Sequence, residues 1–384
     1  MLVFSDVSFY SNLTGRDHER PPHHLLPTST QNCEANNIIQ PATAMLYGAG
    51  LLCCLLCNGS HAAAQELQRA PEPKLEGYEW TFPTMGTRMS LTAYAADKKI
   101  AKAAFDAAEA RVREIASTLS DYDRESETSL LTTAAYPGPE NVSEDLWNVL
   151  VASEKWYKRT DGAFDSSLGS VTRLWRKYRR SERIPSQDEL QKALSSTGWS
   201  NVHLEAKTQS ICLKRPDIKL DFGGIGKGYA VDEAFGVLQD FGVHRCLVNL
   251  SGNMRAGEPP PGREAWRIEI APVQRGEKPL RRIAVANTAL ATSGDLWQFI
   301  EIDGIRRSHV LDPKTGYGVP GPTSVTAIAE TALDADALAT AACILPRDKA
   351  IRLCERWLAA ALLANLKDGQ RRVLTTPNFP NPLP

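Results

Sequence analysis

The sequence has almost no excess of charge of either sign. Its 384 residues include 44 Lys and Arg against 45 Asp and Glu, which gives a formal net charge of −1. A protein that binds nucleic acid through its phosphates needs a clear basic excess, so we expect no nucleic-acid partner. The hydrophobic share of 42% is ordinary for a globular protein, and the length allows a large core or two domains.

The chain also lacks a hydrophobic run long enough to span a bilayer comfortably. The apolar run A-M-L-Y-G-A-G-L-L-C-C-L-L-C has about 14 residues, whereas a transmembrane helix needs about 20. The sequence H-A-A-A-Q follows, a pattern typical of a secretory signal cleaved after Ala64. A lipoprotein signal is disfavoured because leucine, rather than a small residue, precedes both Cys53 and Cys57. The alternative of a buried helix is weakened because no amphipathic sequence flanks the run.

We therefore expect residues 1–64 to form an N-terminal extension and signal peptide. Such a segment predicts export to the periplasm, and association with the surface of the inner membrane is a further expectation. The polar stretch before Met45 is unusually long for a signal peptide, so Met45 is an alternative start.

Cleavage after Ala64 would leave four cysteines without paired spacing. They are Cys212, Cys246, Cys343 and Cys354. Their neighbours are apolar, which favours buried free thiols. A disulfide between two of them stays open.

Histidine is also scarce, with three left after cleavage. His309 lies just before the turn sequence D-P-K-T-G. A lone histidine is more often structural, but at this place it could be a general base exposed to a cleft.

Neither of the two common glycine-rich phosphate motifs is present. The stretch Leu220–Asp232 has the sequence L-D-F-G-G-I-G-K-G-Y-A-V-D, in which Gly228 stands after Lys227 where a Walker A loop needs Ser or Thr. Its glycines also follow G-x-G-x-G rather than the dinucleotide pattern G-x-G-x-x-G. A glycine-rich strand–turn–helix corner with a lysine still suits a nucleotide-like anion. The alternative is that the glycines serve tight packing alone.

The segment D-A-D-A-L-A-T-A-A suggests a cation site. Asp336 and Thr340 are four residues apart on an expected helix, so their oxygen atoms lie on one side of it. A carboxylate and a hydroxyl at this spacing suit a hard divalent cation such as Mg²⁺. The alternative is an acidic first helical turn that complements the helix dipole.

Two loop sequences combine an aromatic residue with a carboxylate. They are S-D-Y-D at residues 120–123 and G-A-F-D at residues 162–165. Each could hold a flat ring by stacking and hydrogen bonding, or could be an ordinary turn.

The apolar spacing predicts strands and helices that mix without strict alternation, which favours an α+β fold with mixed, largely antiparallel sheets and packed helices. Strands are expected on both sides of Met85-Gly86-Thr87 and at Cys246–Leu250, Trp266–Ala271, Ile283–Ala286 and Ser324–Ala329. Helices are expected at about Lys98–Leu119, after caps at Ser143 and Ser186, after the glycine loop, and from near Leu333 and Asp348. An irregular, proline-rich tail is expected at residues 366–384.

Taken in order, these motifs resemble the ApbE family of FAD:protein FMN transferases. The series consists of M-G-T, S-D-Y-D-x-x-S-E, G-A-F-D, L-D-F-G-G-I-G-K-G-Y-A-V-D, H-V-L-D-P-K-T-G, T-S-V-T-A-I-A and D-A-L-A-T-A. The match extends from about Glu79 to Leu358. The resemblance implies an ApbE/T-fold-like domain over residues 77–365.

The resemblance also implies a reaction and a set of site residues. Members of the family bind FAD as substrate together with Mg²⁺, and they move its FMN moiety onto a Thr or Ser of a target flavoprotein, releasing AMP. The residues that match FAD contacts are Met85, Tyr122, Ala163, Phe164, Asp165, Asp221 and Lys227. The residues that match Mg²⁺ ligands are Gly224 (through its carbonyl), Asp336 and Thr340. His309 matches the histidine that activates the acceptor hydroxyl. The implied partner is an extracytoplasmic electron-transfer flavoprotein.

The sequence departs from the family pattern in two places. Ser251-Gly252-Asn253 stands where the family usually has G-G-D, and Gly226 stands where it usually has Ala. Neither change touches the expected metal pair, so we expect activity to survive.

Two other functions remain open at this point. One is a Mg²⁺-dependent FAD pyrophosphatase, in which water replaces the acceptor hydroxyl. The other is a non-catalytic FAD-binding protein, which would not need Asp336, Thr340 and His309.

Overall fold

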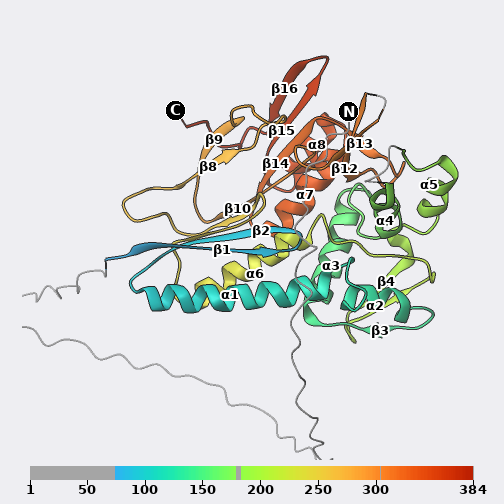
Figure 1. Ribbon diagram of the computed structural model, residues 1–384, viewed down its shortest axis with the longest axis horizontal. Coiled ribbons are helices and arrows are strands. Elements are labelled where there is room, and N and C mark those ends of the chain that lie inside the picture. The colour runs from blue at the N-terminus through green and yellow to red at the C-terminus, as the bar shows by residue number, and fades with distance from the viewer. Residues whose placement is uncertain (1–73, 179–182, 303, 384) are drawn as a thin grey trace, which may run out of the picture. The chain divides into compact units, whose positions relative to one another are not determined.

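Eight strands form one antiparallel sheet against which helices and a β-hairpin pack (Figure 1). The computed structural model describes residues 74–178, 183–302 and 304–383. In sheet order the strands are β1 (Glu76–Thr84), β2 (Thr87–Ala95), β6 (Cys246–Leu250), β7 (Asn253–Ala256), β10 (Thr288–Gly294), β14 (Thr323–Ala329), β15 (Ala360–Lys367) and β16 (Gln370–Thr375). Every neighbouring pair is antiparallel, which confirms the expected α+β class with largely antiparallel sheets.

Four helices cover one face of this sheet. They are α1 (Lys98–Leu119), α6 (Gly226–Asp240), α7 (Ala332–Ile344) and α8 (Arg347–Arg356). Because side chains alternate along a strand, Leu91 of β2 packs in the core under the helices while Tyr94 packs in the core on the other face. The hairpin of β8 (Trp266–Ile270) and β9 (Arg281–Val285) covers that other face. Figure 1 shows α1 and α6 on one side of β1 and β2, with β8 and β9 on the other.

The remaining elements lie beside the sheet (Figure 1). The helices are α2 (Glu127–Ala134), α3 (Glu144–Arg159), α4 (Gly169–Tyr178), α5 (Gln187–Leu194) and the 3₁₀ helix η1 (Trp199–Asn201). One small sheet consists of β3 (Glu140–Asn141), β4 (Val202–Glu205) and β5 (Ser210–Leu213). A second small sheet consists of β11 (Phe299–Ile302), β12 (Ile305–Leu311) and β13 (Gly318–Pro320). The indole Nε1 of Trp175 on α4 donates to the carbonyl oxygen of Gly316 at 2.7 Å. This bond holds the D-P-K-T-G turn, which follows β12, against α4.

Helix α7 is buried on nearly all sides because its residues are mostly small. Its start is capped by the Thr331 hydroxyl, which accepts from the backbone N–H of Asp334 at 3.1 Å. The carboxylate of Asp232 on α6 accepts from the N–H groups of Ala332 and Leu333 at 2.9 and 2.8 Å. The first N–H groups of a helix have no partner within it, so a neighbouring helix here supplies the cap.

Most expected helices are confirmed with nearly the expected bounds. α1 has the expected bounds, Ser143 caps α3, and Ser186 forms a capping box with Glu189 at the start of α5. Strands β10 and β15 are not predicted by the sequence. Their sequences T-A-L-A-T-S-G and A-A-L-L-A-N-L-K lack a regular alternation of apolar and polar residues, because β15 is buried on both faces along most of its length.

The expectation of an irregular tail over residues 366–384 is wrong for its first half. β16 pairs with β15 as far as Thr375, because the first proline of the tail is Pro377. The proline-rich end is irregular but well packed: Phe379 is 6% exposed in the core beneath β8 and β9, and the N–H of Leu383 donates to the carbonyl of Arg282 at 2.8 Å.

Two expectations about the cysteines and the N-terminus have different outcomes. Cys246, Cys343 and Cys354 are buried free thiols, as expected, whereas Cys212 is free but only partly buried. Burial raises the pKa of Cys246 and Cys354 to about 12. The expected signal peptide lies outside the described residues. Within residues 74–178, 183–302 and 304–383, no helix combines the length and hydrophobicity needed to cross a membrane.

The packed tail leads to a stability prediction. Phe379→Ala should lower the free energy of unfolding by about 3–5 kcal/mol, because it removes a buried ring and leaves a cavity. Val373→Ala on β16, where the side chain is exposed, is the control and should cost about 0.5 kcal/mol or less. Denaturant titration measures both values. Equal midpoints for the two variants would show that the tail does not belong to the folded domain.

Candidate functional site

The first turn of α6 and the start of α7 are in backbone contact at the glycine loop. α6 begins at Gly226, directly after the predicted turn. A Cβ atom on Gly228 would lie 2.3 Å from the carbonyl oxygen of Ala332, so no side chain fits there. A Cβ atom on Gly226 would meet the Leu119 side chain at an ordinary 3.4 Å. Packing is thus a real role of Gly228, whereas Gly226 has room for the alanine that is usual in the family.

Three oxygen atoms converge where α7 passes the glycine loop. The Thr340 hydroxyl lies 3.5 Å from the carbonyl oxygen of Gly224 and 3.2 Å from the hydroxyl of Ser293 on β10. One turn earlier on α7, the buried carboxylate of Asp336 accepts from the backbone N–H of Gly228 at 3.1 Å. The Gly224 carbonyl and the Thr340 hydroxyl therefore lie together, and the Asp336 carboxylate contacts the same loop at Gly228.

This donor set suits a small, hard cation. Carbonyl, carboxylate and hydroxyl oxygens are the ligands that Mg²⁺ takes from proteins. In the part of the chain that the structure describes, no three His, Cys, Asp or Glu side chains gather as a metal cluster. A cation at this corner would therefore depend on the mixed oxygen set of Gly224, Asp336 and Thr340.

Lys227 connects the loop to the buried carboxylate. Its ammonium Nζ donates to the carbonyl of Gly223 at 2.6 Å and lies 3.7 Å from Oδ2 of Asp336. Burial raises the pKa of Asp336, and the nearby Lys227 opposes that rise. The carboxylate is incompletely compensated by protein groups, which is the condition that a bound cation would relieve.

A second cluster, centred on Arg176 of α4, holds the other end of the loop. The Arg176 guanidinium binds the carboxylates of Asp121 and Asp221, the latter at 3.1 Å. It also lies over the ring of Tyr122, 4.0 Å from the ring centroid. Asp221 in turn accepts from the N–H of Gly223 at 2.7 Å. Two predicted FAD contacts, Tyr122 and Asp221, are thus fixed by one arginine.

Asp121 lies close to charged groups of both signs in this cluster. Burial and the neighbouring Asp221 carboxylate raise its pKa, although Arg176 acts in the opposite direction. Tyr122 by contrast is 73% exposed, so much of its side chain is open to a ligand.

The G-A-F-D sequence lies beside the glycine loop, but not as a ring-stacking site. Ala163 and Phe164 are buried, and the Phe164 ring packs where a side chain on Gly224 would be. The Asp165 carboxylate accepts from the backbone N–H and the hydroxyl of Ser167 at 2.8 and 2.6 Å, and burial raises its pKa. The idea that the Phe164 ring stacks on a ligand is therefore wrong, because that ring is part of the core. Contact of this run with FAD through its backbone stays a prediction.

His309 is exposed on β12, as its sequence context predicts. Its Nδ1 lies 3.1 Å from the carbonyl oxygen of Gln298. A carbonyl only accepts, so Nδ1 carries the proton in the neutral ring and Nε2 carries the lone pair. β12 is anchored by a buried ion pair in which Arg306 Nε donates to Asp295 at 2.6 Å.

Met85 lies in the turn between β1 and β2, with a φ of 46°. It packs partly buried against the main core. Its role as a flavin contact remains a prediction.

The sequence Ser251-Gly252-Asn253, which differs from the family pattern, connects β6 to β7. Ser251 and Gly252 form the turn, and Asn253 is the first residue of β7. Asn253 is 1% exposed, and its side-chain oxygen has no hydrogen-bond partner among the described residues. The carbonyl of Gly252 accepts from the N–H of Thr292, next to Ser293. An aspartate here would be a buried, unpaired charge in this structure, which the asparagine avoids.

Two residues of the site are missed by the sequence analysis. Arg176 and Ser293 stand in ordinary helix and strand sequences, and only the fold brings them to the loop and to Thr340. No local pattern could have found them.

Comparison with known proteins agrees with this arrangement. The profile described as the ApbE family matches residues 85–363. The FAD:protein FMN transferase of Haemophilus influenzae is 29% identical over 270 residues, which are 68% of this chain and 78% of that protein. The FAD:protein FMN transferase of Treponema pallidum is 28% identical over 340 residues, which are 82% of this chain and 90% of that protein.

Solved structures have the same fold. The flavin transferase ApbE from Vibrio cholerae superposes with a TM-score of 0.72 and 25% identity, covering 79% of this chain and 98% of that one. The ApbE protein from Thermotoga maritima gives 0.71 and 29%, covering 79% and 97%. With a family profile that spans most of the sequence and a matching fold, the chain belongs to the ApbE family.

Proposed function

We propose that this protein transfers the FMN moiety of FAD onto a Thr or Ser hydroxyl of an acceptor flavoprotein and releases AMP. The observation that carries the proposal is the meeting of the Gly224 carbonyl, the Asp336 carboxylate and the Thr340 hydroxyl beside Lys227 at the start of α6. The relatives named FAD:protein FMN transferase support the same reaction.

The reaction forms one phosphoester bond and breaks one phosphoanhydride bond. The acceptor hydroxyl oxygen attacks the phosphorus on the FMN side, its proton passes to a base, and AMP leaves. We propose that Lys227, at the start of α6, binds the pyrophosphate. Asp221 and Tyr122, held by Arg176, are placed to orient the dinucleotide.

Mg²⁺ is the cation that we propose for the oxygen corner. Asp336, Thr340 and the Gly224 carbonyl would hold it, and the ion would supply stabilisation of the negative charge that develops on the leaving phosphate. His309 is the proposed base, because its Nε2 carries the lone pair while Nδ1 faces the Gln298 carbonyl.

The proposed acceptor is an extracytoplasmic electron-transfer protein, and we propose that this enzyme is exported to meet it. The support is the signal-like sequence before Ala64. N-terminal sequencing of the protein recovered from the periplasm should begin at Gln65. An intact N-terminus in the cytoplasmic fraction would contradict export.

The decisive assay mixes the purified protein with FAD, Mg²⁺ and a flavoprotein domain that carries an acceptor Thr. Flavin fluorescence on the denatured acceptor in a gel supports transfer. Free FMN and AMP without labelled acceptor would point to a pyrophosphatase instead. FAD binding with no product would exclude both reactions.

Asp336→Asn should reduce transfer at least about 100-fold, because it removes the carboxylate that we assign to the cation. The substitution keeps the shape of the side chain and an oxygen for the Gly228 N–H. The matched control is Asp334→Asn on the same helix, whose carboxylate binds Lys155 and Trp156 instead. Initial rates over a Mg²⁺ titration measure both variants. Normal Mg²⁺-dependent turnover by Asp336→Asn would remove this residue from the cation site.

His309→Gln should slow transfer by about 100- to 10,000-fold while FAD affinity stays unchanged, because general-base catalysis contributes about that factor. Single-turnover labelling gives the rate, and quenching of flavin fluorescence gives the affinity. His203→Gln, at an exposed histidine on β4, is the control. If His309→Gln labels the acceptor as fast as the parent protein does, His309 is not the general base.

A further inference from the structure

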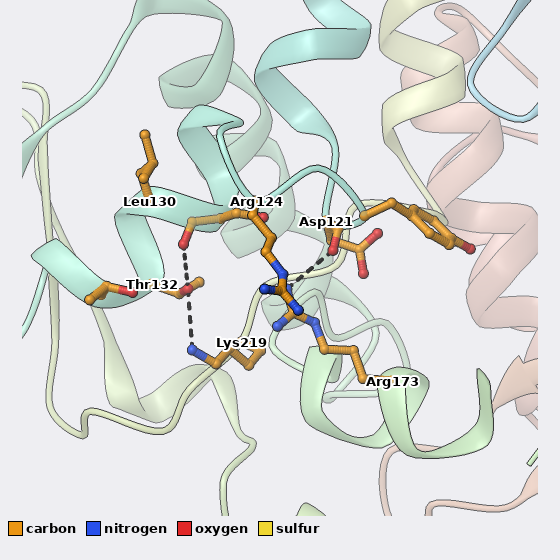
Figure 2. A pocket seen from close by; sticks show the side chains of 9 residues that line it. Asp121, Arg124, Leu130, Thr132, Arg173 and Lys219 are labelled. Carbon is orange, nitrogen blue, oxygen red and sulfur yellow. Dashed lines mark hydrogen bonds between the residues drawn. The ribbon is translucent and has the colours of Figure 1, made fainter. Parts of the chain in front are cut away.

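A positively charged pocket lies next to the Tyr122 side of the site (Figure 2). Its volume is about 380 Å³. Figure 2 shows side chains from separate parts of the chain around it: Arg124 after α1, Thr132 on α2, Arg173 on α4 and Lys219 just before the glycine loop. None of these four residues has a role in the reaction described above.

The pocket holds more positive than negative charge. Arg124, Arg173 and Lys219 line it, and the only carboxylate among its lining residues is Asp121, which Arg176 already binds. In the described part of the chain none of the three cations forms an ion pair. The Lys219 ammonium has the Thr132 hydroxyl at 3.4 Å, and Arg173 donates to the backbone carbonyl of Asp121 at 3.1 Å.

The lysine in particular is only partly compensated. Burial and the nearby Arg173 lower the pKa of Lys219, and the Asp217 carboxylate opposes this shift without cancelling it. Partly buried like charges cost free energy unless an anion offsets them. An anionic group in the pocket would remove this cost.

The residues around the pocket favour a carboxylate of another protein over a phosphate of FAD as its ligand. The proposed place of the pyrophosphate is at Lys227, at the start of α6. At the rim of the pocket, Leu130 is 57% exposed. An exposed apolar side chain beside cations suits a surface that receives another protein.

We propose that this pocket binds an acidic side chain of the acceptor protein, with Lys219 and Arg124 pairing with its carboxylate and Leu130 packing on an adjacent apolar residue. The inference rests on the proposed transferase function. It assigns to the pocket the docking of the acceptor rather than the binding of FAD.

The first test separates the two substrates. Lys219→Met and Arg124→Met should each raise the KM for the acceptor by about tenfold, the value of a hydrogen bond to a charged group, and leave the Kd for FAD within about twofold. Lys219→Arg keeps the charge and should restore most of the acceptor KM. Lys207→Met, on the exposed turn after β4, is the control, and thermal melting checks that the variants fold.

The outcomes decide between the sources of the anion. A weaker Kd for FAD with an unchanged acceptor KM would overturn the proposal and assign the pocket to the nucleotide. Unchanged values for both substrates in folded variants would overturn it altogether. A raised acceptor KM that is rescued by Lys219→Arg supports it.

A second test needs no transfer activity, so it separates a failure of this inference from a failure of the proposed function. Lysine acetylation of the full chain is followed by mass spectrometry with glutarate, a dicarboxylate, or with chloride at equal ionic strength. Glutarate should slow labelling of Lys219 relative to Lys207 by at least about threefold if the pocket binds carboxylates. Equal labelling in both salts would overturn the carboxylate site even if FMN transfer is observed.

Discussion

The contact between the first turns of α6 and α7 is the constraint on which the candidate site depends. Gly224, Gly228 and Asp232 recur every four residues, and all three face α7. Gly228 lets the two backbones meet, Asp232 binds the N-terminus of α7, and Gly224 presents its carbonyl to Thr340. Because both helices repeat with nearly the same period, this one contact sets the positions of all three oxygen ligands. A change in the distance between the helices would move the Gly224 carbonyl away from Asp336 and Thr340, which both lie on α7.

The charged side chains around this contact form ion pairs that are partly or fully buried. Asp336 has Lys227 and a backbone N–H, Asp232 has Arg255 and the start of α7, and Arg176 joins two carboxylates under Tyr122. Burial raises the pKa of both Asp336 and Asp232, while their partners oppose the shift. A cation and a nucleotide would therefore enter a site whose polar groups are already oriented, which is the condition for strong electrostatic stabilisation of a reaction.

Much of this arrangement could be predicted from sequence because its signals are local. The caps at Ser143 and Ser186 and the four-residue spacing of Asp336 and Thr340 depend on neighbours in the chain, and each is found as predicted. Arg176 and Ser293 depend on segments that only the fold brings together, so no pattern identifies them. The same reason explains the error at Phe164: the sequence shows an aromatic residue in a turn but not the core into which it points.

Among the described residues, the two outermost strands of the large sheet, β1 and β16, each have one edge without a neighbouring strand. Such edges can pair with a strand of another molecule and start aggregation. Here β1 carries Glu79 and Pro83, and β16 carries the exposed Arg371 and Arg372. Two copies of either edge would bring like charges together, and Pro83 offers no N–H to a new ladder. These charges and this proline therefore oppose edge-to-edge pairing of two copies at the ends of the eight strands that the structure describes.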